Sequence, residues 1–342
     1  MLNLNNSSER KKILKTAFEE RFILIQEKLE NVIISGVGKS ELYPILKEIS
    51  KDWKDKFRPA LTSLACEAVG GKPSEAIDAG LVFTLASAGF GIHDDIIDHS
   101  RFKHISQTVL GRYGTDTALL VGDLLIFKAW TVVQEMTATN KNPARIASIF
   151  KSYGNLSVEI CEAEFMDAMC RKKINTKLNY RKKILWKSMA EIEACTSIGA
   201  RLGNGSEKEV QALAKFGRSI GFIYRLSDEV QDCLNTRGDL PNRLKYESIP
   251  LPLLFAAKSS KKRKRNLESI IEKTEITSSN IEELIKMCYE SKAFKYILGI
   301  AKKTKSTANR SLELLKYSDA FELLSLMLRH SYATIADLSG QR

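Results

Sequence analysis

Two short acidic motifs place carboxylates four residues apart behind apolar stretches. The first is HDDIID at residues 93–98, which follows residues 74–92, nearly all apolar or small. On a helix, Asp94 and Asp98 share one face. Carboxylates beside an apolar segment are costly unless water or a cation compensates them. Mg²⁺ suits such a wall, since it binds oxygen ligands, keeps some of its water and bridges to substrate phosphates.

The second motif has the same spacing. It reads DEVQD at residues 228–232 and follows the apolar run FGRSIGFIYRL at 216–226. A single acidic pair on a helix is typical of a solvated face. Two pairs in matching contexts favour a function instead: two sites on two buried helices can clamp a diphosphate through several metal ions.

The elements that must position these motifs are helices. The chain has only 7 Pro and 19 Gly in 342 residues, few helix breakers for its length. Apolar residues at helical spacing, and segments apolar on all sides, indicate a helical bundle. We found no alternating strand pattern and no repeat. The sequence predicts one all-α domain over residues 1–342, a central ring of helices with peripheral helices. The expected helices are 7–34, 39–52, one from Pro59 to Gly70, 74–99, 115–138, 144–170 and 208–233, with a helical tail over 251–342.

The formal net charge of +12 suits an anionic partner. The run KKRKR at 261–265 is expected to be a solvated loop, and without interleaved aromatic residues it does not indicate nucleic-acid binding. The six cysteines form no CxxC pair, which is typical of reduced thiols in a cytoplasmic protein. We identified no apolar run of 18 residues for a membrane span and no signal-peptide core.

The order of several motifs resembles the trans-isoprenyl diphosphate synthases. DDIIDHS at 94–100 with YGTDTALLVGDLL at 113–125 is similar to the first aspartate-rich region of that family, and SDEVQD at 227–232 to the second. KFRPAL at 56–61 resembles its GGKxxRP element, and Lys187-Ser188 its Lys-Thr pair.

This resemblance implies an all-α isoprenoid synthase bundle around a central cavity. It implies a prenyltransferase that joins isopentenyl diphosphate head to tail to an allylic diphosphate, with two to three Mg²⁺ ions. The product would be an all-E polyprenyl diphosphate, with geranylgeranyl diphosphate as our expectation. By the same analogy we expect a homodimer, no nucleic acid and at most peripheral contact with a membrane.

The resemblance also assigns roles to residues. Asp94, Asp98 and Asp228 would be the main magnesium ligands, and Asp95 and Asp232 would be further ligands or would order metal-bound water. Lys187 would hold the departing diphosphate. The expected allylic diphosphate site is Lys103, Lys187 and Lys245.

The expected isopentenyl diphosphate site departs from the family pattern. Asp55 stands where the lysine of GGKxxRP is expected, Ser87 replaces a histidine, and His104 replaces the second arginine of a pair. The usual Phe-Gln before the second motif is Tyr224-Arg225. The remaining candidates for this site are Lys54, Lys56, Arg58, Ser87 and His104.

Product length is expected to depend on residues beneath the first motif. Phe90 lies one helical turn below Asp94 and Ala86 two turns below. The product chain would grow into a tunnel there. The large side chain of Phe90 would close this tunnel, whereas the small residues Ala86 and Gly89 would leave room for a longer chain. Core packing is the alternative explanation for all three residues. Two other functions stay open: a non-catalytic or regulatory subunit of a heteromeric synthase, and a class I terpene cyclase.

Overall fold

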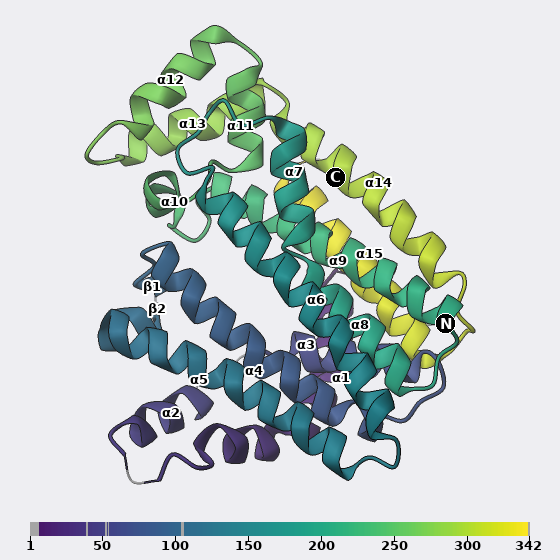
Figure 1. Ribbon diagram of the computed structural model, residues 1–342. Coiled ribbons are helices and arrows are strands. Elements are labelled where there is room, and N and C mark those ends of the chain that lie inside the picture. Colours follow the sequence, from purple (N-terminus) through teal and green to yellow (C-terminus); the bar gives the residue numbers. More distant parts are fainter. Residues whose placement is uncertain (1–6, 39, 52, 54, 104–105, 341–342) are drawn as a thin grey trace.

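The computed structural model describes residues 7–38, 40–51, 53, 55–103 and 106–340, and it is almost entirely helical (Figure 1). This confirms the predicted all-α class. The helices are α1 (Ser7–Ile34), α2 (Leu42–Lys51), α3 (Phe57–Glu67), α4 (Pro73–Ile97), α5 (Val109–Thr139), α6 (Pro143–Ala168), α7 (Leu178–Lys187), α8 (Ala190–Leu202), α9 (Glu207–Cys233), α10 (Leu240–Tyr246), α11 (Leu251–Lys258), α12 (Lys261–Ile271), α13 (Ser278–Glu290), α14 (Ala293–Leu312) and α15 (Asp319–Leu338).

Three local features differ from the expectations. Two short antiparallel strands, β1 (Phe102–Lys103) and β2 (Ser106–Gln107), follow α4. Helix α5 begins before residue 115, but Gly114 interrupts it with φ 80°, a conformation that glycine adopts without steric cost. The run KKRKR is the start of α12 and not a loop, since the hydroxyl of Ser260 caps the helix by accepting from the Arg263 N–H at 3.2 Å.

Helix α4 lies in the core, where it packs against α3, α5 and α8. It is long and apolar enough to cross a membrane, but most of its apolar stretch is buried inside the bundle, as in the core helix of a globular protein. Helix α9 packs in turn against α8, α14 and α15. The buried side chains form one continuous cluster, which favours the single domain that we expect for residues 1–342.

Both acidic motifs lie at helix C-termini. The first occupies the end of α4, where Asp98 is the C-cap, and the second occupies the end of α9. Helix α6 also ends in an acidic segment that contains Glu164 and Asp167. The C-terminal end of a helix carries partial negative charge, so these ends favour cations.

Candidate active site

Asp94, Asp98, Asp228 and Asp232 line one cavity of about 320 Å³. The first two come from α4 and the other two from α9, helices that are far apart in the sequence. The structure therefore brings together the two motifs that we singled out, in one polar site. Asp167, at the end of α6, lines the same cavity.

A further carboxylate completes the acidic side of this site. One ligand oxygen each of Asp94, Asp98 and Glu164 lies within 4.8 Å of the others. Burial and the charges of Glu247 and Asp94 raise the pKa of Asp98 to about 8. Burial and Asp94 likewise raise the pKa of Glu164 to about 7. Arg171 lies 3.6 Å from Asp98, and Lys103 lies 3.8 Å from Asp94, but these cations do not cancel the upward pKa shifts of Asp98 and Glu164. Clustered oxygen donors of this kind fit a hard divalent cation such as Mg²⁺.

The carboxylates of the second motif are paired with arginines. Asp228 lies 3.0 Å from the Arg237 guanidinium, and Asp232 is ion-paired with Arg243. Arg225 also lines the cavity, and the charges of Glu229 and Asp228 hold its pKa above the ordinary value despite burial. The cavity lining therefore contains three arginines, Arg225, Arg237 and Arg243, that an anionic ligand can contact.

Lys103, on β1, stands between this cavity and a second one of about 370 Å³, since it lines both. Its ammonium lies 2.6 Å from Asp95 and 3.8 Å from Asp94. Asp95 is buried and faces the second cavity. The ion pair with Lys103 thus compensates Asp95, while Asp94 and Asp98 remain open to the first cavity.

The second cavity contains part of the expected isopentenyl diphosphate site. Arg58, Ser87 and Asp55 line it. Lys56 is not among the lining residues and points to α1 instead, with its ammonium 3.2 Å from Glu19. Two other candidates, Lys54 and His104, lie outside the described residues.

Two lysines predicted to bind the allylic diphosphate are not among the residues that line either cavity. Lys187, in the last turn of α7, is ion-paired with Glu162 on α6. Lys245 lines a separate hollow of about 470 Å³ beside α12. Their roles stay predictions, because each would require its side chain to turn toward the diphosphate.

The residues beneath the first motif are packed. Ala86 is buried, and Phe90 packs against the core. An added Cβ at Gly89 would lie 2.6 Å from the carbonyl oxygen of Gly122, so Gly89 lets α4 and α5 approach closely. Packing thus accounts for Gly89, and its influence on product length stays a prediction.

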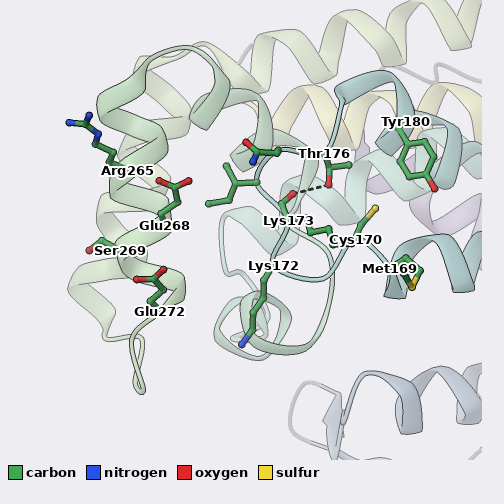
Figure 2. A pocket seen from close by; sticks show the side chains of 12 residues that line it. Met169, Cys170, Lys172, Lys173, Thr176, Tyr180, Arg265, Glu268, Ser269 and Glu272 are labelled. Atoms are coloured by element: carbon green, nitrogen blue, oxygen red, sulfur yellow. Dashed lines mark hydrogen bonds between the residues drawn. The ribbon is translucent and has the colours of Figure 1, made fainter.

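A larger hollow, of about 1060 Å³, lies elsewhere, between α12 and the segment that follows α6 (Figure 2). Arg265 and Glu268 line it from α12 and Glu272 from the C-cap of that helix, with Lys172 and Lys173 from the opposite segment. Its lining contains both cations and carboxylates, and neither acidic motif contributes a side chain.

The sequence reasoning missed Glu164, Arg237 and Arg243. Glu164 lies in EAEFMDA at 162–168, at the end of an amphipathic helix, and only its proximity to another acidic residue could have marked it. The two arginines lie in and just before α10, where no spacing rule connects them to the second motif.

The chain is similar to known proteins in both sequence and fold. The sequence model of the family "Polyprenyl synthetase" matches residues 40–288. The chain is 29% identical to the short chain isoprenyl diphosphate synthase of Methanothermobacter thermautotrophicus, over 80% of this chain and 84% of that protein. It is 30% identical to the geranylgeranyl diphosphate synthase of Methanosarcina mazei, over 56% of this chain and 59% of that protein.

Solved structures are similar as well. The geranylgeranyl pyrophosphate synthetase of Pyrococcus horikoshii superposes with a TM-score of 0.85 at 25% identity, over 94% of this chain and 98% of that one. The family match covers most of the chain and includes both acidic motifs. The chain therefore belongs to the polyprenyl synthetase family and is a prenyltransferase.

Proposed function

We propose that this protein joins isopentenyl diphosphate head to tail to an allylic diphosphate, and that its main product is geranylgeranyl diphosphate. The observation that carries this proposal is the pair of adjacent cavities that share Lys103. One has carboxylates at converging helix ends, and the other contains Arg58. The synthases named above support the reaction, and they do not favour a non-catalytic subunit or a terpene cyclase.

Asp94, Asp98 and Glu164 would hold Mg²⁺, with Asp228 on the opposite wall for a further ion, and we expect two to three ions in all. When bound, magnesium would neutralise the allylic diphosphate and assist its departure. Arg225 and Lys103 would bind the phosphate oxygens as fixed positive charges.

All bonds that break and form in the reaction belong to the substrates. The allylic C–O bond breaks, the alkene of isopentenyl diphosphate forms the new C–C bond, and a proton is lost. The chain binds both substrates side by side and keeps water from the allylic cation. Lys103 is placed to contact both diphosphates, because it lines both cavities.

We also propose that two copies associate through α5 and α6. These helices expose large apolar side chains at Leu120, Phe127, Val158 and Phe165, and exposed apolar side chains that gather on one surface are typical of protein interfaces. Light scattering coupled to gel filtration should give the mass of a dimer for the wild type and of a monomer for Phe127→Glu. We further propose a cytoplasmic location with at most peripheral membrane contact.

The test of the activity uses the purified chain with Mg²⁺, labelled isopentenyl diphosphate and each of the C5, C10, C15 and C20 allylic diphosphates. We expect the label to appear in an extractable C20 product. The activity of Asp94→Ala should be lower by at least about a thousandfold. An absence of incorporation with every primer, in protein that binds allylic diphosphate in the presence of Mg²⁺, would refute the proposed activity.

A further inference from the structure

The second cavity offers few uncompensated cations to an acceptor diphosphate. Three cationic side chains are among its described lining residues, and each has a carboxylate partner. Lys103 is paired with Asp95, and Arg112 is paired with Glu48. The third cation, Arg58, has two carboxylate partners, each at 2.8 Å, whereas the second carboxylate near Lys103, Asp94, lies 3.8 Å away.

The two partners of Arg58 engage different nitrogens. Its Nε donates to Glu191 at 2.8 Å, and its Nη1 donates to Asp55 at 2.8 Å. The side chains of Arg58, Asp55 and Glu191 are only 27%, 23% and 10% exposed. Water screens such charges poorly, so both contacts are stronger than an exposed ion pair. A phosphate that approaches Arg58 has to compete with them.

The position of Asp55 is fixed by the helix that it precedes. Its Oδ1 accepts from the Phe57 N–H at 2.9 Å and from the Arg58 N–H at 3.3 Å, at the start of α3. Its other oxygen, Oδ2, is therefore directed to the Arg58 guanidinium. An asparagine can keep the contacts to the helix start, since its side-chain oxygen caps helices as well as that of aspartate does.

Glu191 contacts Arg58 from the interior of the protein. It is buried at the start of α8 and fixes the Nε side of Arg58 there. Asp55 lines the cavity, and Glu191 is not among the lining residues. An incoming phosphate thus meets Asp55 and not Glu191 as its competitor.

We propose that Asp55 determines the affinity of this cavity for the acceptor diphosphate, by occupying the part of Arg58 that a phosphate would bind. The inference rests on the proposed function, because it assigns the acceptor to the second cavity. Binding of the acceptor breaks the contact between Asp55 and Arg58, and the carboxylate then repels the phosphate from nearby. Asp55 is a specificity-determining residue that keeps the Michaelis constant of the acceptor high.

The test compares Asp55→Asn with the wild type. The substitution removes the charge and keeps the start of α3. We expect the KM for isopentenyl diphosphate to fall about tenfold, the effect of one charge-assisted contact. The KM for the allylic diphosphate should stay within twofold, and kcat should not rise in proportion. Asp78→Asn is the matched control, since Asp78 on α4 is paired with Lys28 on α1 and is not among the residues that line either cavity.

Calorimetric titration with isopentenyl diphosphate and Mg²⁺ separates this inference from the proposed activity. Tighter binding by Asp55→Asn supports the inference even if neither protein turns over. An unchanged or weaker affinity in a folded Asp55→Asn protein that turns over would overturn it and leave the activity standing. An equal gain in Asp78→Asn would also overturn it, because net charge would then explain the effect.

Discussion

Glu229, the second residue of DEVQD, is a fully buried carboxylate next to the active site. It accepts hydrogen bonds from Arg181 at 2.9 Å, from Arg243, and from the backbone N–H of Leu251 at 2.5 Å. Arg243 is also paired with Asp232. Replacing Glu229 with glutamine keeps the shape of the side chain and leaves two buried guanidinium groups without their shared counter-charge.

The size of the effect can be worked from the charge balance. Burial opposes the ionised form of Glu229, but Arg181 and Arg243 outweigh it and hold its pKa at about 2, below the ordinary 4.5. Each tenfold change in proton affinity corresponds to about 1.4 kcal/mol, so ionised Glu229 contributes about 3 kcal/mol to the free energy of unfolding at pH 7. Loss of one partner of a buried ion pair costs a similar amount, about 3–5 kcal/mol.

The pH dependence follows from the lowered pKa. The contribution is complete above the unfolded pKa of 4.5 and is lost as the pH falls through about 2. Urea unfolding monitored by far-UV circular dichroism should therefore show Glu229→Gln destabilised by about 3 kcal/mol at pH 7 and by only about 1 kcal/mol at pH 3.

The control is Glu207→Gln, at the exposed start of the same helix. Glu207 contacts Arg201 at 3.2 Å in an exposed ion pair, which is worth less than about 1 kcal/mol. A loss below about 1 kcal/mol for Glu229→Gln, equal at pH 7 and pH 3, would refute the reasoning, because the carboxylate would then not be stabilised by the arginines.

Mg²⁺ affinity should rise between pH 6 and pH 8.5, because metal binding requires ionised ligands and the pKa values of Asp98 and Glu164 are raised to about 8 and about 7. Mn²⁺ binding can be measured at each pH by electron paramagnetic resonance. If these carboxylates do not bind the ion, the measured affinity will not change with pH. In the same assay Glu164→Gln should weaken binding about tenfold at pH 8, and an unchanged affinity would remove Glu164 from the site. Gly89→Ala should destabilise the protein by about 1–3 kcal/mol in urea unfolding, since its Cβ would meet Gly122 at 2.6 Å. Gly91→Ala, with open space around the added Cβ, should be neutral or stabilising, and equal effects of the two substitutions would exclude the close approach of α4 and α5 as the cause.

The helices and the two acidic motifs were predictable because their signals are local. Apolar residues at helical spacing indicate α1, and stretches that are apolar on all sides indicate the buried helix α4. Element ends were less predictable, because they depend on single contacts. The hydroxyl of Ser260, for example, starts α12 within a run that composition alone suggested to be a loop.

Several site residues depend on contacts between distant segments. Glu164 joins Asp94 and Asp98 because α6 and α4 end at the same cavity. Lys56 and Arg58 are only two residues apart but point to different places. Lys56 pairs with Glu19 on α1, and Arg58 lines the second cavity. No spacing in the sequence distinguishes them.

The sequence by itself determined the fold class and the two carboxylate pairs, since these follow from residue type and from periodicity along one helix. The family was indicated by the resemblance of several ordered motifs to those of known synthases. The tertiary structure decided which charges are compensated. It gave Arg58 two carboxylate partners and Asp232 an arginine, and it brought Asp94, Asp98 and Glu164 within 4.8 Å of one another with only the longer contacts of Lys103 and Arg171 beside them. The physical reason is that electrostatic energy depends on distance and burial in space, and residues such as Arg58 and Glu191 are 133 positions apart in the chain.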